Sequence, residues 1–142
     1  MKNLKIFRNS RVIVTGHTGF KGSWLTAWLK QLGANVMGIS LNSPTNPSHF
    51  EASKIKLGIK DVRIDIRDRA KLEKQITIFK PNFVFHLAAQ SLVGLSYQNP
   101  AMTWQTNVFG TLNILESIRK LKNVCNVVII TSDKCYFNRE IH

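Results

Sequence analysis

The hydrophobic positions of this chain alternate between short apolar runs and longer stretches with helical periodicity. Residues 11–16 form a β-branched run that ends in glycine, a pattern typical of a strand leading into a turn. Across residues 20–32 the apolar positions recur on one helical face, and Gly33 follows as a stop signal. That face consists of Trp24, Leu25, Trp28, Leu29 and Leu32. The sequence therefore predicts a strand, a glycine turn and a helix whose apolar face packs on the core.

The middle of the chain repeats this alternation. Residues 35–41 form a second apolar run, which ends in residues 42–48, a segment rich in the turn formers Asn, Ser and Pro. Residues 62–66 alternate as a short third strand, and residues 68–79 carry apolar positions at helical spacing before Pro81. We therefore expect two further strands and a second helix here.

The last third of the chain predicts two more strands and a long helix. Residues 83–89 are nearly all apolar, as in a parallel strand with both faces covered. Residues 101–121 carry a helical stripe, and residues 126–131 are interpreted as a fifth strand of the same buried type. The stripe comprises Val108, Leu112, Leu115, Ile118 and Leu121.

Strands and helices that alternate along the chain predict an α/β fold of the Rossmann type. The expected architecture is a parallel sheet of order 3-2-1-4-5 with helices on both faces, and its ligand crevice lies where the strand order reverses. No internal repeat or linker divides residues 1–142, so we expect one domain. Residues 137–142 contain no terminating element, which favours a truncated domain.

Composition narrows the class of protein. A chain of 142 residues with 44% hydrophobic content can bury one sizeable core. No segment approaches the roughly 20 apolar residues of a membrane span, and basic residues interrupt the N-terminal segment, so we expect a cytoplasmic protein without membrane contact. Cys125 and Cys135 have no CxxC pattern or partner histidines, and neither a metal site nor a disulfide framework is predicted.

The net charge of +12 raises the question of a nucleic-acid partner. The basic residues are scattered along the chain rather than clustered among aromatic residues, which favours solvated helix faces and strand ends. A missing part of the protein could also offset the charge. We therefore expect no nucleic-acid partner.

Three glycines stand between the first predicted strand and the first predicted helix. Gly16, Gly19 and Gly22 have the spacing that lets a backbone turn sharply, approach a pyrophosphate and begin a helix whose N–H groups bind phosphates. This context predicts a dinucleotide site. Lys21 either adds a charge near the phosphates or is a solvated surface lysine.

The turn, residues 15–22, resembles the TGxxGFxG motif of the extended short-chain dehydrogenases/reductases. The resemblance extends to a pair after the third strand, to residues 86–90 and to an asparagine within a helix. It implies NAD as the cofactor. The residues implied to bind it are Gly16, His17, Thr18, Gly19, Phe20, Lys21, Gly22, Asn42, Asp65, Ile66, Leu87, Ala88, Ala89, Gln90 and Asn107. Besides Lys21, two have alternatives, because Asp65 could cap a helix and Asn107 could be a surface amide.

Within that superfamily the chain resembles the CDP-glucose 4,6-dehydratases over nearly its whole length. The most specific segment is residues 131–136, Thr-Ser-Asp-Lys-Cys-Tyr, at the carboxyl end of the fifth strand. The resemblance implies that Ser132 hydrogen-bonds the C4 oxygen of the sugar, that Asp133 is the acid that expels water and that Lys134 acts at the C5 proton. A lysine base requires a lowered pKa. The implied reaction oxidises C4, eliminates water across C5 and C6 and returns the hydride to C6.

The Tyr-x-x-x-Lys pair that this resemblance implies does not occur in the 142 residues. We therefore expect an incomplete, inactive part of a lyase, whose full-length form binds a nucleotide sugar and assembles as a homo-oligomer. Two alternatives stay open, namely another nucleotide-sugar epimerase or dehydratase and a non-catalytic dinucleotide-binding fragment.

The second strand bears on the choice of cofactor. In many NAD enzymes an acidic residue at its end binds the ribose 2′-hydroxyl, and here the position holds Asn42. No arginine stands nearby in the sequence to hold a 2′-phosphate. We therefore expect a modest preference for NAD over NADP.

Overall fold

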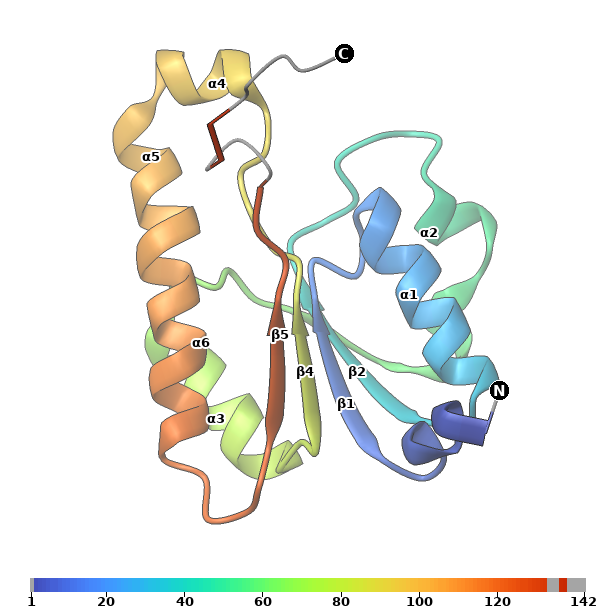
Figure 1. The fold of residues 1–142 in the computed structure, drawn as a ribbon. Coiled ribbons are helices and arrows are strands. Elements are labelled where there is room, and N and C mark those ends of the chain that lie inside the picture. The colour runs from blue at the N-terminus through green and yellow to red at the C-terminus, as the bar shows by residue number, and fades with distance from the viewer. Residues whose placement is uncertain (1, 133–135, 138–142) are drawn as a thin grey trace.

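The computed structural model, which describes residues 2–132 and 136–137, contains a five-stranded parallel sheet of order β3-β2-β1-β4-β5 (Figure 1). The fold class and strand order predicted from the sequence are thus confirmed. The strands are β1 (Arg11–Thr15), β2 (Asn35–Ser40), β3 (Lys60–Arg63), β4 (Phe83–His86) and β5 (Asn126–Ile129). The first strand is central because β2 and β4 pair with it on opposite sides, and the order reverses at its carboxyl end.

Helices cover both faces of the sheet (Figure 1). They are η1 (Lys2–Phe7), α1 (Phe20–Gln31), α2 (His49–Ala52), η2 (Ile55–Gly58), α3 (Arg69–Phe79), α4 (Val93–Gln98), α5 (Pro100–Trp104), η3 (Gln105–Phe109) and α6 (Gly110–Arg119). Helices α3 and α6 lie on one side and α1 and α2 on the other. The short helices η1, α2, η2 and α4 were not predicted, because none is long enough to show a helical period.

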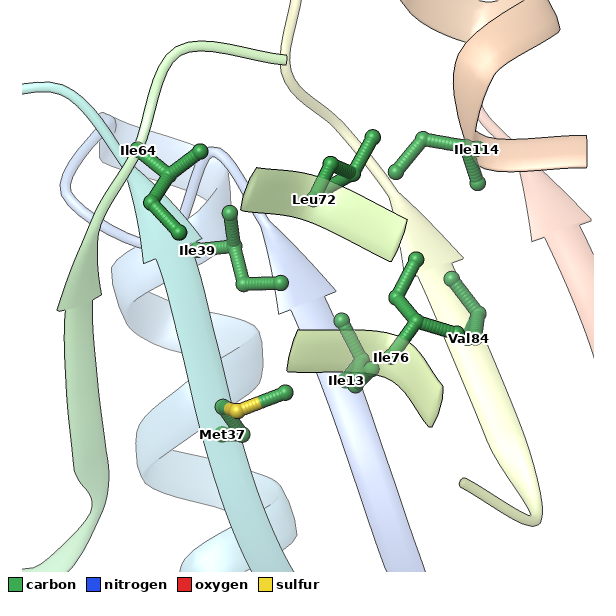
Figure 2. Close-up of a cluster of buried hydrophobic side chains, with 8 residues drawn as sticks. All are labelled: Ile13, Met37, Ile39, Ile64, Leu72, Ile76, Val84 and Ile114. Atoms are coloured by element: carbon green, nitrogen blue, oxygen red, sulfur yellow. The ribbon is translucent and has the colours of Figure 1, made fainter. Parts of the chain in front are cut away.

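Alternation along each strand divides the apolar core between the two faces. Ile13 of β1 points to the side of α3 and α6, whereas Val12 and Val14 point to α1. Figure 2 shows the larger cluster, whose members are nearly inaccessible to solvent. They are Ile13, Met37, Ile39, Ile64, Leu72, Ile76, Val84 and Ile114. Burial of each such side chain stabilises the fold by about 1.5–3 kcal/mol.

Helix α1 packs on the sheet with a different face from the predicted one. Trp24 and Trp28, expected in the core, are 56% and 52% exposed. The buried face consists of Gly22, Ser23, Thr26 and Leu29. The glycine turn holds α1 close to the sheet, so small residues occupy the contact and the tryptophans face outward.

The predicted long helix is divided, and its stripe is partly exposed. The π-helical turn η3 shifts the register between α5 and α6, so Val108, Leu112 and Leu115 do not line one buried face. The buried residues of α6 are Gly110, Ile114 and Ser117. Strand β5 was expected to be buried, yet Val128 is 44% exposed, because β5 pairs only with β4 among the described residues.

Strand β3 begins and ends earlier than predicted. It pairs with β2 from Lys60 to Arg63, so the alternating segment that follows leaves the sheet and Asp65 lies beyond the strand. Within residues 2–132 and 136–137, no helix is long and apolar enough to cross a membrane.

Candidate functional site

The turn after β1 requires glycine at its first position. Gly16 has φ +73°, in the left-handed region, and its N–H donates to the carbonyl of Ile39 at 2.9 Å. A Cβ at this position would lie 2.8 Å from the backbone nitrogen of Ala88. The turn therefore connects β1 with the ends of both neighbouring strands, β2 and β4.

Gly22 is required for a different reason. A Cβ there would overlap the carbonyl oxygen of Gly16, whereas a Cβ at Gly19 would lie 3.3 Å from the same atom. Gly19 caps α1 without any side-chain hydrogen bond, so the first N–H groups of the helix stay available at this edge. Such groups bind phosphates. The side chains of Phe20 and Lys21 are exposed beside them.

His17 lies beneath the turn and is fully buried. Its Nε2 contacts Oδ1 of Asp61 on β3 at 2.9 Å, and its ring meets Phe50 edge-on. Burial lowers the pKa of His17, although Asp61 acts in the opposite direction. The buried side chain of His17 cannot reach a ligand, so only its backbone is available for contact.

Thr18 ties the turn to the end of β2. Its side chain is buried, its hydroxyl lies 2.8 Å from that of Ser40, and it donates to the carbonyl of Leu41 at 3.2 Å. The same carbonyl accepts a hydrogen bond of 2.7 Å from Nη1 of Arg63. The turn and the end of β3 therefore share one backbone oxygen.

An open pocket of about 360 Å³ adjoins this point, at the carboxyl ends of β2 and β3. It is lined by Asn42, Ser43, Thr45, Asn46, Glu51 and Arg63. We expected no arginine near Asn42, and in the folded structure this expectation is wrong. Arg63 is distant in sequence, but the pairing of Ser40 with Arg63 brings the two strand ends together.

Asp65 and Ile66 follow β3. Both carboxylate oxygens of Asp65 accept hydrogen bonds from Arg67, and these hold the pKa of Asp65 below its ordinary value. The cap of α3 is Asp68, which accepts from the backbone N–H of Lys71, so the alternative role of Asp65 as a helix cap is wrong. Ile66 is buried against Gly110.

A relay of neutral groups lies on the other side of the turn. The hydroxyl oxygen of Thr15 accepts the N–H groups of Leu87 and Ala88, both at 3.1 Å, so its proton goes to Nδ1 of His86 at 2.7 Å. Nε2 of His86 then carries the proton and donates to Thr111 at 2.9 Å. Burial lowers the pKa of His86 to about 4, so the ring is neutral at pH 7.

The relay continues to Asn107 and Gln90. Thr111 donates to the carbonyl of Asn107 at 2.7 Å. The side chain of Asn107 accepts from the N–H of Gln90 at 2.8 Å and donates to its carbonyl at 2.9 Å. Asn107 is therefore not a surface amide but a clamp on the segment after β4, in which Ala89 is exposed.

The predicted catalytic segment is described only in part. Ser132 lies just beyond β5 and is exposed, and the N–H of Ile130 donates to the carbonyl of His86, which keeps this segment beside β4. Asp133 and Lys134 lie outside the described residues. The structure therefore brings the turn, the β2 pocket and the β4 segment to one edge.

Several polar residues of this edge were missed from the sequence. Thr15, Asp61 and Thr111 lack a motif of their own, and they become significant only through their partners in neighbouring elements. The sequence placed Arg63 near the start of the predicted third strand, so it gave no signal that Arg63 would lie beside the end of β2.

A parallel sheet whose glycine turn lies at the reversal of strand order defines a Rossmann-type domain. A family model described as GDP-mannose 4,6 dehydratase matches residues 13–140, and the chain belongs to this family. It is similar to the CDP-glucose 4,6-dehydratase of Salmonella typhimurium, with 51% identity over 140 residues, which cover 99% of this chain and 39% of that protein.

Solved structures agree with this assignment. An epimerase from Methanothermobacter thermautotrophicus matches with a TM-score of 0.82 and 28% identity over 99% of this chain. A UDP-glucose-4-epimerase from Stenotrophomonas maltophila, solved with bound NAD and formylated UDP-arabinopyranose, matches with a TM-score of 0.77 and 27% identity over 93%. The chain spans 40% of each of these proteins.

Proposed function

We propose that this chain forms the NAD-binding part of a CDP-glucose 4,6-dehydratase, which converts CDP-glucose to CDP-4-keto-6-deoxyglucose. The 51% identity to the Salmonella typhimurium enzyme carries the proposal. The turn supports it, because a dinucleotide needs close backbone approach and free helical N–H groups, and both are present at the first turn.

The described residues fit NAD along the whole carboxyl edge. Gly16 and Gly22 keep side-chain atoms out of the turn, so the N-terminus of α1 can hold a pyrophosphate. The pocket at Asn42 suits the adenosine ribose, and the clamped segment at Gln90 suits the nicotinamide end. Bound NAD would supply the hydride chemistry, as an acceptor for C4 of the sugar and a donor to C6.

The chain's own residues would move the protons. Ser132 would hydrogen-bond the C4 oxygen, Lys134 would take the C5 proton, and Asp133 would give a proton to the leaving C6 hydroxyl, which departs as water. The Tyr-x-x-x-Lys pair needed to remove the C4 hydroxyl proton is not in the sequence. The 142-residue chain by itself should therefore bind NAD without turnover.

A chimera tests the proposal directly. This chain replaces the matching N-terminal segment of the Salmonella typhimurium CDP-glucose 4,6-dehydratase, and the product formed from CDP-glucose is identified. We expect the 4-keto-6-deoxy sugar. An epimerised product, or turnover of another nucleotide sugar alone, would contradict the proposal, and NAD binding measured on the same chimera shows whether it has folded.

Asp133→Asn in this chimera separates the steps. Oxidation at C4 should survive while dehydration slows about 10²–10⁴-fold, because one positioned general acid is lost. In a single turnover, reduced cofactor and a 4-keto sugar that retains its C6 hydroxyl should accumulate. If both steps slow together and the thermal midpoint falls, Asp133 has a structural role instead.

A further inference from the structure

The pocket beside the end of β2 holds a carboxylate that the sequence did not place there. Asn42 stands where an acidic residue often binds the ribose 2′-hydroxyl, but Glu51 of α2 lines the same pocket. The two residues are separated by a loop, so their proximity is a property of the fold.

The other charge in the pocket, Arg63, is already compensated. Its Nη2 contacts Oδ2 of Asp61 at 2.9 Å, and its Nη1 donates to the carbonyl of Leu41 at 2.7 Å. The second oxygen of Asp61 contacts His17, which is buried and neutral. Arg63 and Asp61 therefore form a pair with no net charge, and the guanidinium already has partners.

Glu51 has no such compensation. Its backbone N–H donates to the hydroxyl of Ser48, the cap of α2, which fixes the start of the helix, and its Oε1 accepts from Ser43 at 3.3 Å. Among the ion pairs of the described part of the chain, none includes Glu51. The pocket therefore carries one uncompensated negative charge.

We propose that Glu51 is the specificity-determining carboxylate of the cofactor site, which accepts a hydrogen bond from the adenosine ribose of NAD and repels the 2′-phosphate of NADP. This rests on the proposed function. Glu51 thereby takes the part usually filled by the acid at the end of the second strand, and it does so from a helix rather than from the strand.

The experiment measures the dissociation constants of NAD and NADP for the 142-residue protein by fluorescence titration. The parent protein should bind NAD more tightly, and Glu51→Gln should reduce the NAD-to-NADP preference about tenfold, the worth of about one charge-assisted hydrogen bond. The matched control is Glu73→Gln on α3, which removes the same charge away from the pocket and should leave the preference unchanged.

A second variant examines the rival assignment to Arg63. Arg63→Ala combined with Asp61→Asn removes the pair without changing the net charge and should change both affinities by a similar factor, whereas a selective loss of NADP affinity would show that Arg63 reads the 2′-phosphate. That result, or an unchanged preference in Glu51→Gln, overturns the inference and leaves the proposed function intact. If neither dinucleotide binds the parent protein, the proposed function and the inference both fail.

Discussion

Two histidines on either side of the glycine turn are buried in different ways. His17 faces a carboxylate, Asp61, which also holds Arg63 at the edge of the open pocket. His86 lies between two hydroxyls, Thr15 and Thr111. The β2 side of the edge thus contains a compensated charge network near solvent, and the β4 side contains a neutral relay that fixes the backbone after the strand.

The two sides support the carboxyl edge of the sheet in different ways. On the β4 side the hydrogen-bonding groups are neutral, and together they fix the tautomer of His86 and the positions of the N–H groups of Leu87 and Ala88. On the β2 side the partners are charged, and a change in one charge alters the field in the pocket. The first arrangement fixes the backbone after β4, and the second holds compensated charges at the edge of the pocket.

The largest effect is expected at the turn that joins the two sides. Gly22→Ala places a methyl group on the carbonyl oxygen of Gly16, and the backbone must move on both the β2 and β4 sides. We expect a loss of about 3 kcal/mol or more in the free energy of unfolding, measured with urea. Gly94→Ala is the control, because a Cβ there meets no atom within 4 Å. Equal stability of the two variants would show that α1 does not need this close approach.

The neutral relay predicts a pH dependence of stability. The pKa of His86 is about 4 in the folded protein and 6.5 in the unfolded chain, so the unfolded chain binds more protons between these values. The stabilisation is complete above about pH 6.5 and is lost as the pH falls towards 4, by at most about 3 kcal/mol. Urea unfolding across this range measures it.

A variant assigns this pH dependence to one side. His86→Asn keeps an acceptor for Thr15 and removes the titrating ring, so stability should fall less steeply with acid. His17→Asn should flatten the profile less, because Asp61 partly offsets the effect of burial on the pKa of His17. The opposite ranking would mean that the charged side dominates the acid sensitivity.

The smallest of these effects is expected from the charged network. Asp61→Asn leaves Arg63 without its carboxylate and His17 with a weaker partner, so the free energy of unfolding should fall by about 2 kcal/mol. The same change should increase NADP affinity relative to NAD, because Arg63 is no longer compensated. A loss of stability with an unchanged preference would show that the network only supports the fold.

The sheet and its order could be predicted because their signals are local. Five short apolar runs alternate with helical segments, and the spacing of Gly16, Gly19 and Gly22 marks the turn. The buried face of α1 could not be predicted in this way. Hydrophobicity favoured Trp24 and Trp28, whereas the close approach of the helix to the sheet selects small residues. Hydrophobic periodicity carries no information on the distance between a helix and the sheet.

The candidate site was predictable only where one segment forms it. Asn107 was chosen from a resemblance, yet its contact with Gln90 depends on the π-helical turn η3, which no pattern indicated. Arg63 was overlooked because it is distant from Asn42 in the sequence, although the register of β3 against β2 places it beside Leu41. Such contacts depend on strand register, and β3 begins two residues and ends three residues earlier than predicted, which was enough to hide them.

The shared carbonyl of Leu41 marks a boundary for protein engineering. Thr18 and Arg63 both bond to it, and helix α2 is held to α1 at His49, which stacks on Trp24. Residues 42–47 thus lie between two anchored points. Exchanging this loop would leave the supports of the glycine turn in place and would change only the side chains that it contributes to the pocket.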